Sequence, residues 1–277
     1  MNCLACGELT TDYVSKIPTQ YCKKCGLLFQ TISRSKKDME KLYRENFWRE
    51  HNVEETLDSD FTNKKGKDLI LLWNSMYRYS KDFLQNKIEF LEIGAGTGNS
   101  LFMFENAGYN VIGIEPDPNN TRLINQKLNR GKCITGFVEQ ITTEKKFDII
   151  WMSHSLEHVF RPDEILLKCF ELLKKDGIVF IAIPDCENPE MRNQSINNDS
   201  HLWHFTRNAL KNLALRTGYK VEKCDSLKLI KTNERRIHKI LRKMNLSRLS
   251  EIILPYYPFK LTTKKNGYEI RIILRKK

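Results

Sequence analysis

The feature that most constrains the fold of this chain is a regular alternation of short apolar runs with amphipathic segments, which begins at Ile88. The apolar runs have the length of buried strands, and each segment between them has the spacing of a helix with one apolar face. Strands are expected at 88–94, 110–116, 132–138, 146–155 and 177–185, and helices at 99–108, 119–131 and 162–177. This alternation predicts an α/β fold with a mostly parallel sheet, helices on both faces and ligands at the C-terminal ends of the strands.

Two more strands are expected near the end of the chain, at 219–230 and 267–277, after a helix at 206–218. No full crossover pattern separates these two strands, so we expect them to pair antiparallel at an edge of the sheet. The connection between them, at about 232–266, is an insertion rich in Lys and Arg.

These elements divide the chain into a module at 1–30, a helical linker or lid at 31–86, and an α/β domain at 87–277. The linker is expected to contain a helix from about Phe61 to Asn86. Before that helix, the linker has Tyr43, Phe47 and Trp48 at helical spacing, which fits either a lid over a site or a packing stripe.

The N-terminal module carries four cysteines in the pattern C-x2-C-x15-C-x2-C. This spacing is typical of a zinc ribbon, in which four thiolates surround one Zn2+ at about 2.3 Å. Two disulfides or a redox-active CxxC pair are the alternatives. The expected zinc ligands are Cys3, Cys6, Cys22 and Cys25, whereas the remaining four cysteines stand singly in apolar surroundings.

The first strand of the α/β domain runs into a glycine-rich turn, "EIGAGTGN", with glycines at 94, 96 and 98. Such a turn lets backbone N–H groups approach a ligand closely. A dinucleotide-binding turn would have a third glycine at position 99, where Asn99 stands. Glu115 ends the second strand and can take both hydroxyls of a ribose, so a nucleoside cofactor is expected.

Four stretches together, "EIGAGTG", "GIEPDP", "KFDIIWMSHSLEHV" and "LLKKDGIVFIAIP", make residues 88–277 similar to the class I S-adenosylmethionine (SAM)-dependent methyltransferases, specifically small-molecule enzymes with an H-x-L-E-H stretch. The resemblance implies a Rossmann-like seven-stranded mostly parallel sheet with an antiparallel edge strand. It also implies a glycine turn beneath the methionine part of SAM and an acid on the ribose, with adenine near Phe137, Val138 or Glu139. The expected cofactor-binding residues are Glu92, Gly94, Gly96, Gly98, Glu115 and Glu139.

Two histidine pairs compete for the role of general base: His154 and His158 after the fourth strand, and His201 and His204 after the fifth. The stretch "SHLWHFT" resembles the E-H-L-x-Y-F-S stretch of sugar C-methyltransferases, which also carry an N-terminal zinc module and in which the histidine assists catalysis. That histidine corresponds to His201. Because Ser200 and His204 replace the glutamate and tyrosine of that pattern, we predict O-methylation of a saccharide, with His201 as the leading base and His154 as the second candidate. His158 and Glu157 are expected to cap or orient the loop.

The formal net charge of +12 lies entirely in residues 228–277, which hold 15 Lys and Arg against 3 acidic residues. Within 232–266 the apolar and basic residues separate onto two helix faces. Such a helix lies at the inner face of a membrane or packs on its own domain or a second subunit. The chain lacks a long apolar span and an N-terminal secretory pattern, so a cytoplasmic protein is expected.

Two other functions fit parts of the sequence. Some ribosomal RNA guanine methyltransferases also pair a zinc ribbon with this fold, and the basic C-terminal segment would suit RNA. The chain lacks the [DNS]-P-P-[YFW] turn and a Pro-Cys pair, but the enzymes that methylate a guanine ring nitrogen need neither motif. A non-catalytic zinc-ribbon binding module is the third hypothesis, against which the intact glycine turn and Glu115 argue.

Overall fold

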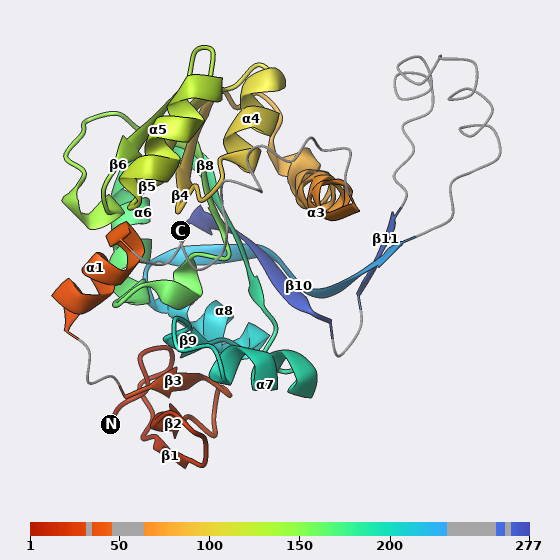
Figure 1. Ribbon diagram of the computed structural model, residues 1–277. Helices are drawn as coiled ribbons and strands as arrows, with labels where there is room; N and C mark the ends of the chain where they lie inside the picture. Colours follow the sequence, from red (N-terminus) through yellow and green to blue (C-terminus); the bar gives the residue numbers. More distant parts are fainter. Residues whose placement is uncertain (32–34, 46–63, 232–258, 264–266) are drawn as a thin grey trace.

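The computed structural model describes residues 1–31, 35–45, 64–231, 259–263 and 267–277 of the chain. Its main feature is a large sheet with strand order β11-β10-β12-β8-β7-β4-β5-β6 (Figure 1). The strands are β4 (Glu89–Ile93), β5 (Asn110–Glu115), β6 (Lys132–Thr135), β7 (Phe147–Ser153), β8 (Leu173–Pro184), β10 (Tyr219–Lys231), β11 (Phe259–Thr263) and β12 (Glu269–Lys276).

The five neighbouring strands β6, β5, β4, β7 and β8 are parallel. Strand β12 lies between β8 and β10 and is antiparallel to both. The predicted fold class is therefore confirmed: a seven-stranded, mostly parallel Rossmann-like sheet with the last two strands paired antiparallel. Short β11 adds an eighth strand by pairing antiparallel with β10. The antiparallel strand β12 lies inside the sheet rather than at its edge, and the strand order reverses between β4 and β7, where this fold binds ligands.

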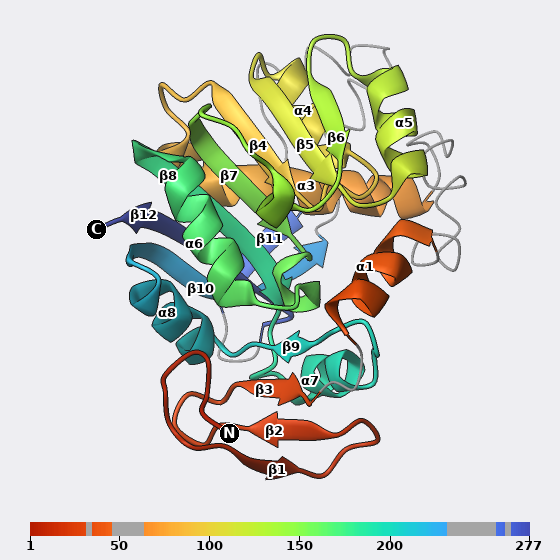
Figure 2. The same cartoon turned by 90° about the vertical axis from the view of Figure 1, so that its left-hand side faces the viewer.

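Helices cover both faces of this sheet, which Figure 2 shows with α6 and α8 in front and α3 behind. Side chains of α6 and α8 share one buried cluster with one face of the central strands. Side chains of α3, α4 and α5 share a second cluster with the other face, in which Trp151 stacks on Phe180 at 3.7 Å between ring centroids. The helices are α1 (Lys36–Glu45), α3 (Lys64–Ser80), α4 (Asn99–Asn106), α5 (Pro118–Lys127), α6 (Pro162–Leu172), α7 (Pro189–Ile196) and α8 (Arg207–Arg216).

The N-terminal residues form a second, small antiparallel sheet of β1 (Thr11–Tyr13), β2 (Thr19–Tyr21) and β3 (Leu28–Gln30). Its fourth strand, β9 (Trp203–His204), comes from the α/β domain and pairs with β3. Figure 1 shows these strands packed below α7 and α8. The cysteine module is thus joined to the segment that follows β8.

Two expected helix boundaries are wrong. Helix α6 ends at Leu172, not at Gly177, because Leu173 to Gly177 continue as the start of β8 with Leu173 paired to Phe147. The helix expected from Phe61 to Asn86 is described as α3 followed by a 3-10 turn at Lys81–Phe83. Both errors arise because apolar spacing marks the centre of an element better than its ends.

The basic insertion at 232–266 lies outside the described residues, except for β11. The same holds for Phe47 and Trp48. Among the described residues, no helix combines the length and the apolar composition needed to cross a bilayer.

Candidate functional site

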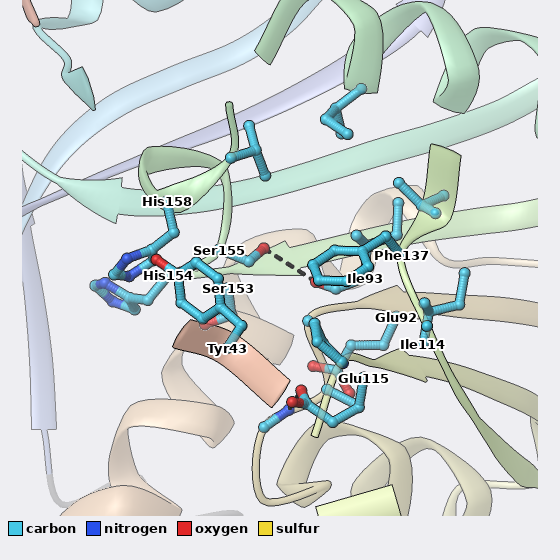
Figure 3. A pocket seen from close by; sticks show the side chains of 18 of the residues that line it. Tyr43, Glu92, Ile93, Ile114, Glu115, Phe137, Ser153, His154, Ser155 and His158 are labelled. Atoms are coloured by element: carbon cyan, nitrogen blue, oxygen red, sulfur yellow. Dashed lines mark hydrogen bonds between the residues drawn. The ribbon is translucent and has the colours of Figure 1, made fainter. Parts of the chain in front are cut away.

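A cavity of about 510 Å3 opens at the C-terminal ends of β4, β5 and β7. This is within the range of small-molecule and cofactor sites. Figure 3 shows Glu92 and Glu115 on one side of it and His154 and His158 on the other. The glycine turn, the ends of β5, β6 and β7, and helices α1 and α3 all contribute to its wall. Of the predicted cofactor-binding residues, Glu92, Gly94, Gly96, Glu115 and Glu139 line the cavity, whereas Gly98 does not.

The glycine turn after β4 has the backbone conformation that only glycine adopts easily. Gly94 has φ +73°, and a Cβ there would lie 2.7 Å from Cβ of Ser155. Ser155 in turn donates a hydrogen bond of 3.0 Å to the carbonyl oxygen of Ile93. Gly98, with φ +76°, precedes the first residue of α4. Glycine is therefore needed here so that the ends of β4 and β7 can approach each other, and the turn presents its backbone to the cavity.

Glu115, at the end of β5, fixes this turn and is itself only 3% exposed. One carboxylate oxygen accepts a hydrogen bond from the N–H of Gly96 at 2.7 Å. The other accepts from the N–H of Asp117 at 3.0 Å. The carboxylate is thus rigidly held at the cavity wall with hydrogen bonds to an ionised acceptor, which are stronger than neutral ones.

Glu92, on β4, is also buried at the cavity wall, and its Oε2 has no hydrogen-bond partner among the described residues. Burial raises its pKa to about 8, with a contribution from the nearby charge of Glu115. A buried carboxyl group that lacks a partner is compensated when a ligand with a positive charge or an N–H donor occupies the cavity.

The opposite side of the cavity is formed by the turn after β7. His154 has an unusual φ of +51° for a residue other than glycine, and its side chain forms ion pairs with Glu157 at 3.4 Å and Glu269 at 3.0 Å. The side chain of His154 is 41% exposed, so burial opposes its charge only weakly, and the two carboxylates raise its pKa to about 10. His154 is therefore positively charged at neutral pH.

Of the two histidines predicted as bases, His154 lines the cavity and His201 does not. His201 lies behind His158, with 4.6 Å between the ring centroids. Burial, together with the charge of His158, lowers the pKa of His201 to about 4, so its imidazole is neutral at neutral pH. His204 is fully buried, on β9.

The four N-terminal cysteines converge on one point, with all four sulfurs within 4.8 Å of one another. The sulfurs of Cys3 and Cys25 are 3.5 Å apart, and those of Cys6 and Cys22 are 3.4 Å apart. None of the four is in a disulfide. Four sulfurs at about 2.3 Å from one zinc ion are about 3.8 Å from each other, so the cluster is close to the size of a tetrahedral Zn2+ site.

The two cysteine pairs also have the same local turn. The N–H of Gly7 donates to the carbonyl of Cys3 and the N–H of Gly26 donates to that of Cys22, each at 2.8 Å. Both glycines have φ near +80°. Backbone N–H groups also reach the sulfurs: those of Ala5 and Cys6 reach Cys3, and that of Leu27 reaches Cys25, as expected for metal-binding thiolates.

Comparison with known families decides the class of the chain. The model described as "Methyltransferase domain" matches residues 43–223. The chain belongs to the methyltransferase domain family. The predicted enzyme class, a SAM-dependent methyltransferase, is thereby confirmed at the level of the family.

Individual relatives match a smaller part of the methyltransferase. An uncharacterized methyltransferase of Alkaliphilus oremlandii is 32% identical over 109 residues, which is 39% of this chain and 50% of that protein. A ubiquinone biosynthesis O-methyltransferase of Rhodopseudomonas palustris is 34% identical over 103 residues, which is 34% of this chain and 39% of that protein. The chain thus spans half or less of the length of these curated relatives.

Among solved structures, a SAM-dependent methyltransferase from Thermotoga maritima superimposes with a TM-score of 0.57. The match covers 86% of this chain and 100% of the other at 20% identity. At this identity the likeness shows a common fold.

The methyltransferase also places residues in the cavity that the sequence did not single out. Met39, on α1, and Leu72 and Trp73, on α3, line it together with Tyr43. The hydroxyl of Tyr43 donates to the carbonyl of Ser200 at 3.2 Å. Helical spacing in "KDMEKLYRE" marks Met39 and Tyr43 as one helix face, but nothing local shows that this face meets the glycine turn.

Proposed function

We propose that this methyltransferase transfers a methyl group from SAM to a hydroxyl oxygen of a small molecule, with a saccharide as the acceptor class. The observation that supports it is the division of a single cavity into an acidic wall, formed by Glu92 and Glu115, and a histidine wall, formed by His154 and His158. When bound, SAM supplies an electrophilic methyl group on a sulfonium. The protein then has to hold the cofactor, align the acceptor oxygen and stabilise its negative charge.

The acidic wall fits the cofactor. Glu115, held by two backbone N–H groups, is proposed to accept hydrogen bonds from the ribose hydroxyls. Glu92 is proposed to face the methionine part, whose amino group is a donor that its Oε2 lacks. Gly94, Gly96 and Gly98 let the backbone approach closely. Glu139 lies at the cavity beside Gly136 and Phe137, which supports an adenine contact there.

The histidine wall fits the acceptor. His154 carries a positive charge because of Glu157 and Glu269, so we propose that it stabilises the developing oxyanion rather than removing the proton. His201 does not line the cavity, so we propose no direct contact between its imidazole and the acceptor. Methylation of oxygen is also the activity in the name of the Rhodopseudomonas palustris relative, over the part of the chain that it shares.

We propose that Cys3, Cys6, Cys22 and Cys25 hold a structural Zn2+ in the module at 1–30. Four thiolates close the coordination shell, so the ion stabilises the module and takes no part in the chemistry. We also propose that the chain consists of this module, a linker at 31–86 that acts as a lid, and the methyltransferase domain at 87–277. A peripheral contact with an anionic membrane or with RNA depends on 232–266, most of which lies outside the described residues.

The proposed function is tested by incubating the protein with SAM and panels of nucleotide sugars, free glycans and phenols, followed by mass spectrometry. We expect a product heavier by one methylene group, from a saccharide, and formation of S-adenosylhomocysteine (SAH). Methylation only of phenols would refute the saccharide, and methylation of RNA with steep salt dependence would favour the RNA alternative.

A further inference from the structure

A cluster of three ligand-type side chains lies beside the cavity, behind its histidine wall. Glu157, His158 and His201 each offer one ligand atom, and these atoms lie within 4.8 Å of one another. Two imidazoles and one carboxylate suit first-row divalent cations, and such a triad leaves coordination positions open. We propose that these three residues bind a divalent cation that contacts the methyl acceptor. The binding stands on its own, and its catalytic use rests on the function proposed above.

The burial of Glu157 carries this inference. Glu157 is 1% exposed, and neither carboxylate oxygen has a hydrogen-bond partner among the described residues. It forms an ion pair with His154 at 3.4 Å, longer than a hydrogen bond to a carboxylate. The neighbouring histidines, His154 first among them, compensate its charge in part and lower its pKa against the effect of burial. A coordinated cation would in addition give the carboxylate oxygens a direct contact, which they lack.

Both histidines are oriented as metal ligands usually are. Nδ1 of His158 donates to the carbonyl oxygen of Ser200 at 2.9 Å. Nδ1 of His201 is 2.9 Å from the hydroxyl oxygen of Ser195. Metal-binding histidines usually engage their second ring nitrogen in this way, which fixes the ring. The ligand atom of each histidine would then be Nε2.

The backbone holds the three residues in one frame even though they come from different segments. The N–H of Leu202 donates to the carbonyl oxygen of Glu157 at 2.9 Å. From the cysteine module, Nε2 of Gln30 donates to the carbonyl oxygen of His201 at 2.8 Å. The cluster is therefore part of the fold and not a chance approach of exposed side chains.

The site opens toward the acceptor because His158 lines the cavity. Open coordination positions favour an acceptor with two neighbouring oxygens, such as a vicinal diol of a sugar or an aromatic ring. A hydroxyl bound to the cation would lose its proton to water in the cavity more readily. The acceptor oxygen then bonds to the methyl carbon, while the carbon–sulfur bond breaks and its electron pair stays on sulfur.

Titration with Co2+ by calorimetry tests the site, with the full-length protein already loaded with one Zn2+ per chain. Wild type should bind about one further Co2+. His201→Ala and Glu157→Gln should each bind it about a hundredfold more weakly or not at all, because each loses a direct ligand. Glu105→Gln, which changes a similarly buried carboxylate outside the cavity, is the matched control and should bind as wild type does. Circular dichroism checks that each variant is folded; His201, which is only partly buried, decides the outcome if Glu157→Gln does not fold.

A wild-type protein that takes up no Co2+ beyond the zinc would overturn the proposal, and so would unchanged binding by His201→Ala. Methyl transfer that proceeds equally with and without added cation, in a protein that binds none, would remove the cation and leave the proposed function intact. Cation binding without methyl transfer to any acceptor would instead refute the proposed function and leave the site.

Discussion

Replacing Glu115 by glutamine is expected to weaken cofactor binding. In the ligand-free protein its two oxygens accept hydrogen bonds from Gly96 and Asp117. Glutamine offers one accepting oxygen and replaces the other with an N–H2 group, which would face a backbone N–H. Each lost hydrogen bond to a charged acceptor costs about 1.5–3 kcal/mol. If the ribose contact accounts for one such bond, the Kd for SAH rises about 13- to 150-fold.

The assay is calorimetric titration with SAH, with the unfolding midpoint measured in parallel. Glu105→Gln is the matched control, because Glu105 is equally buried and accepts from the N–H groups of Asn129, Arg130 and Gly131 at 2.6–3.0 Å, outside the cavity. The control should lower the unfolding midpoint and leave the Kd unchanged. Equal affinity of Glu115→Gln and wild type, or equal loss in both variants, would refute the assignment.

Three further predictions concern Glu92, Gln30 and the cysteine cluster. Burial raises the pKa of Glu92 from 4.5 to about 8. The protonated carboxyl group therefore contributes fully to stability below pH 4.5, and this contribution is lost as the pH rises through about 8. Glu92→Gln should remove the corresponding fall in the unfolding midpoint between these pH values. An unchanged pH profile in that variant would contradict the buried, protonated carboxyl. Gln30→Ala removes a hydrogen bond to the His201 carbonyl worth about 0.5–1.5 kcal/mol, so it should lower turnover about two- to tenfold and leave the affinity for SAH unchanged. The control Gln20→Ala, within the cysteine module, should leave turnover unchanged. Equal effects of the two variants would show that Gln30 does not hold the His201 loop. Chelation of the proposed zinc ion, or Cys3→Ser, should lower the unfolding midpoint by about 6–12 °C if about 3 kcal/mol of stability is lost. Cys224→Ser, away from the cluster, should change the midpoint little. A midpoint that does not respond to chelation would argue against a bound metal.

The sequence predicted the sheet and the position of the glycine turn and Glu115 at one cavity because those features are local. Apolar spacing defines each strand, and the glycine turn and Glu115 are fixed by their places at the ends of β4 and β5. The topology then brings these ends together without further information. The same logic placed His154, which follows β7 directly, at the cavity.

The arrangement of the histidines could not be predicted in this way. His201 sits in a loop whose path is set by β9, which pairs with β3 of the cysteine module, about 170 residues earlier in the chain. Neither spacing nor propensity shows such a contact. We expected His158 to cap or orient the loop, but in the structure it forms part of the cavity wall, and His201 lies behind it. Trp73 was missed for a similar reason, because only the packing of α3 brings it to the site.

A crystal structure of the protein with SAH tests the central claim most directly. We expect SAH in the cavity, with its ribose hydroxyls on Glu115, its methionine part along the glycine turn near Glu92, and its sulfur facing His154 and His158. SAH bound elsewhere, or with its ribose turned away from Glu115, would contradict it.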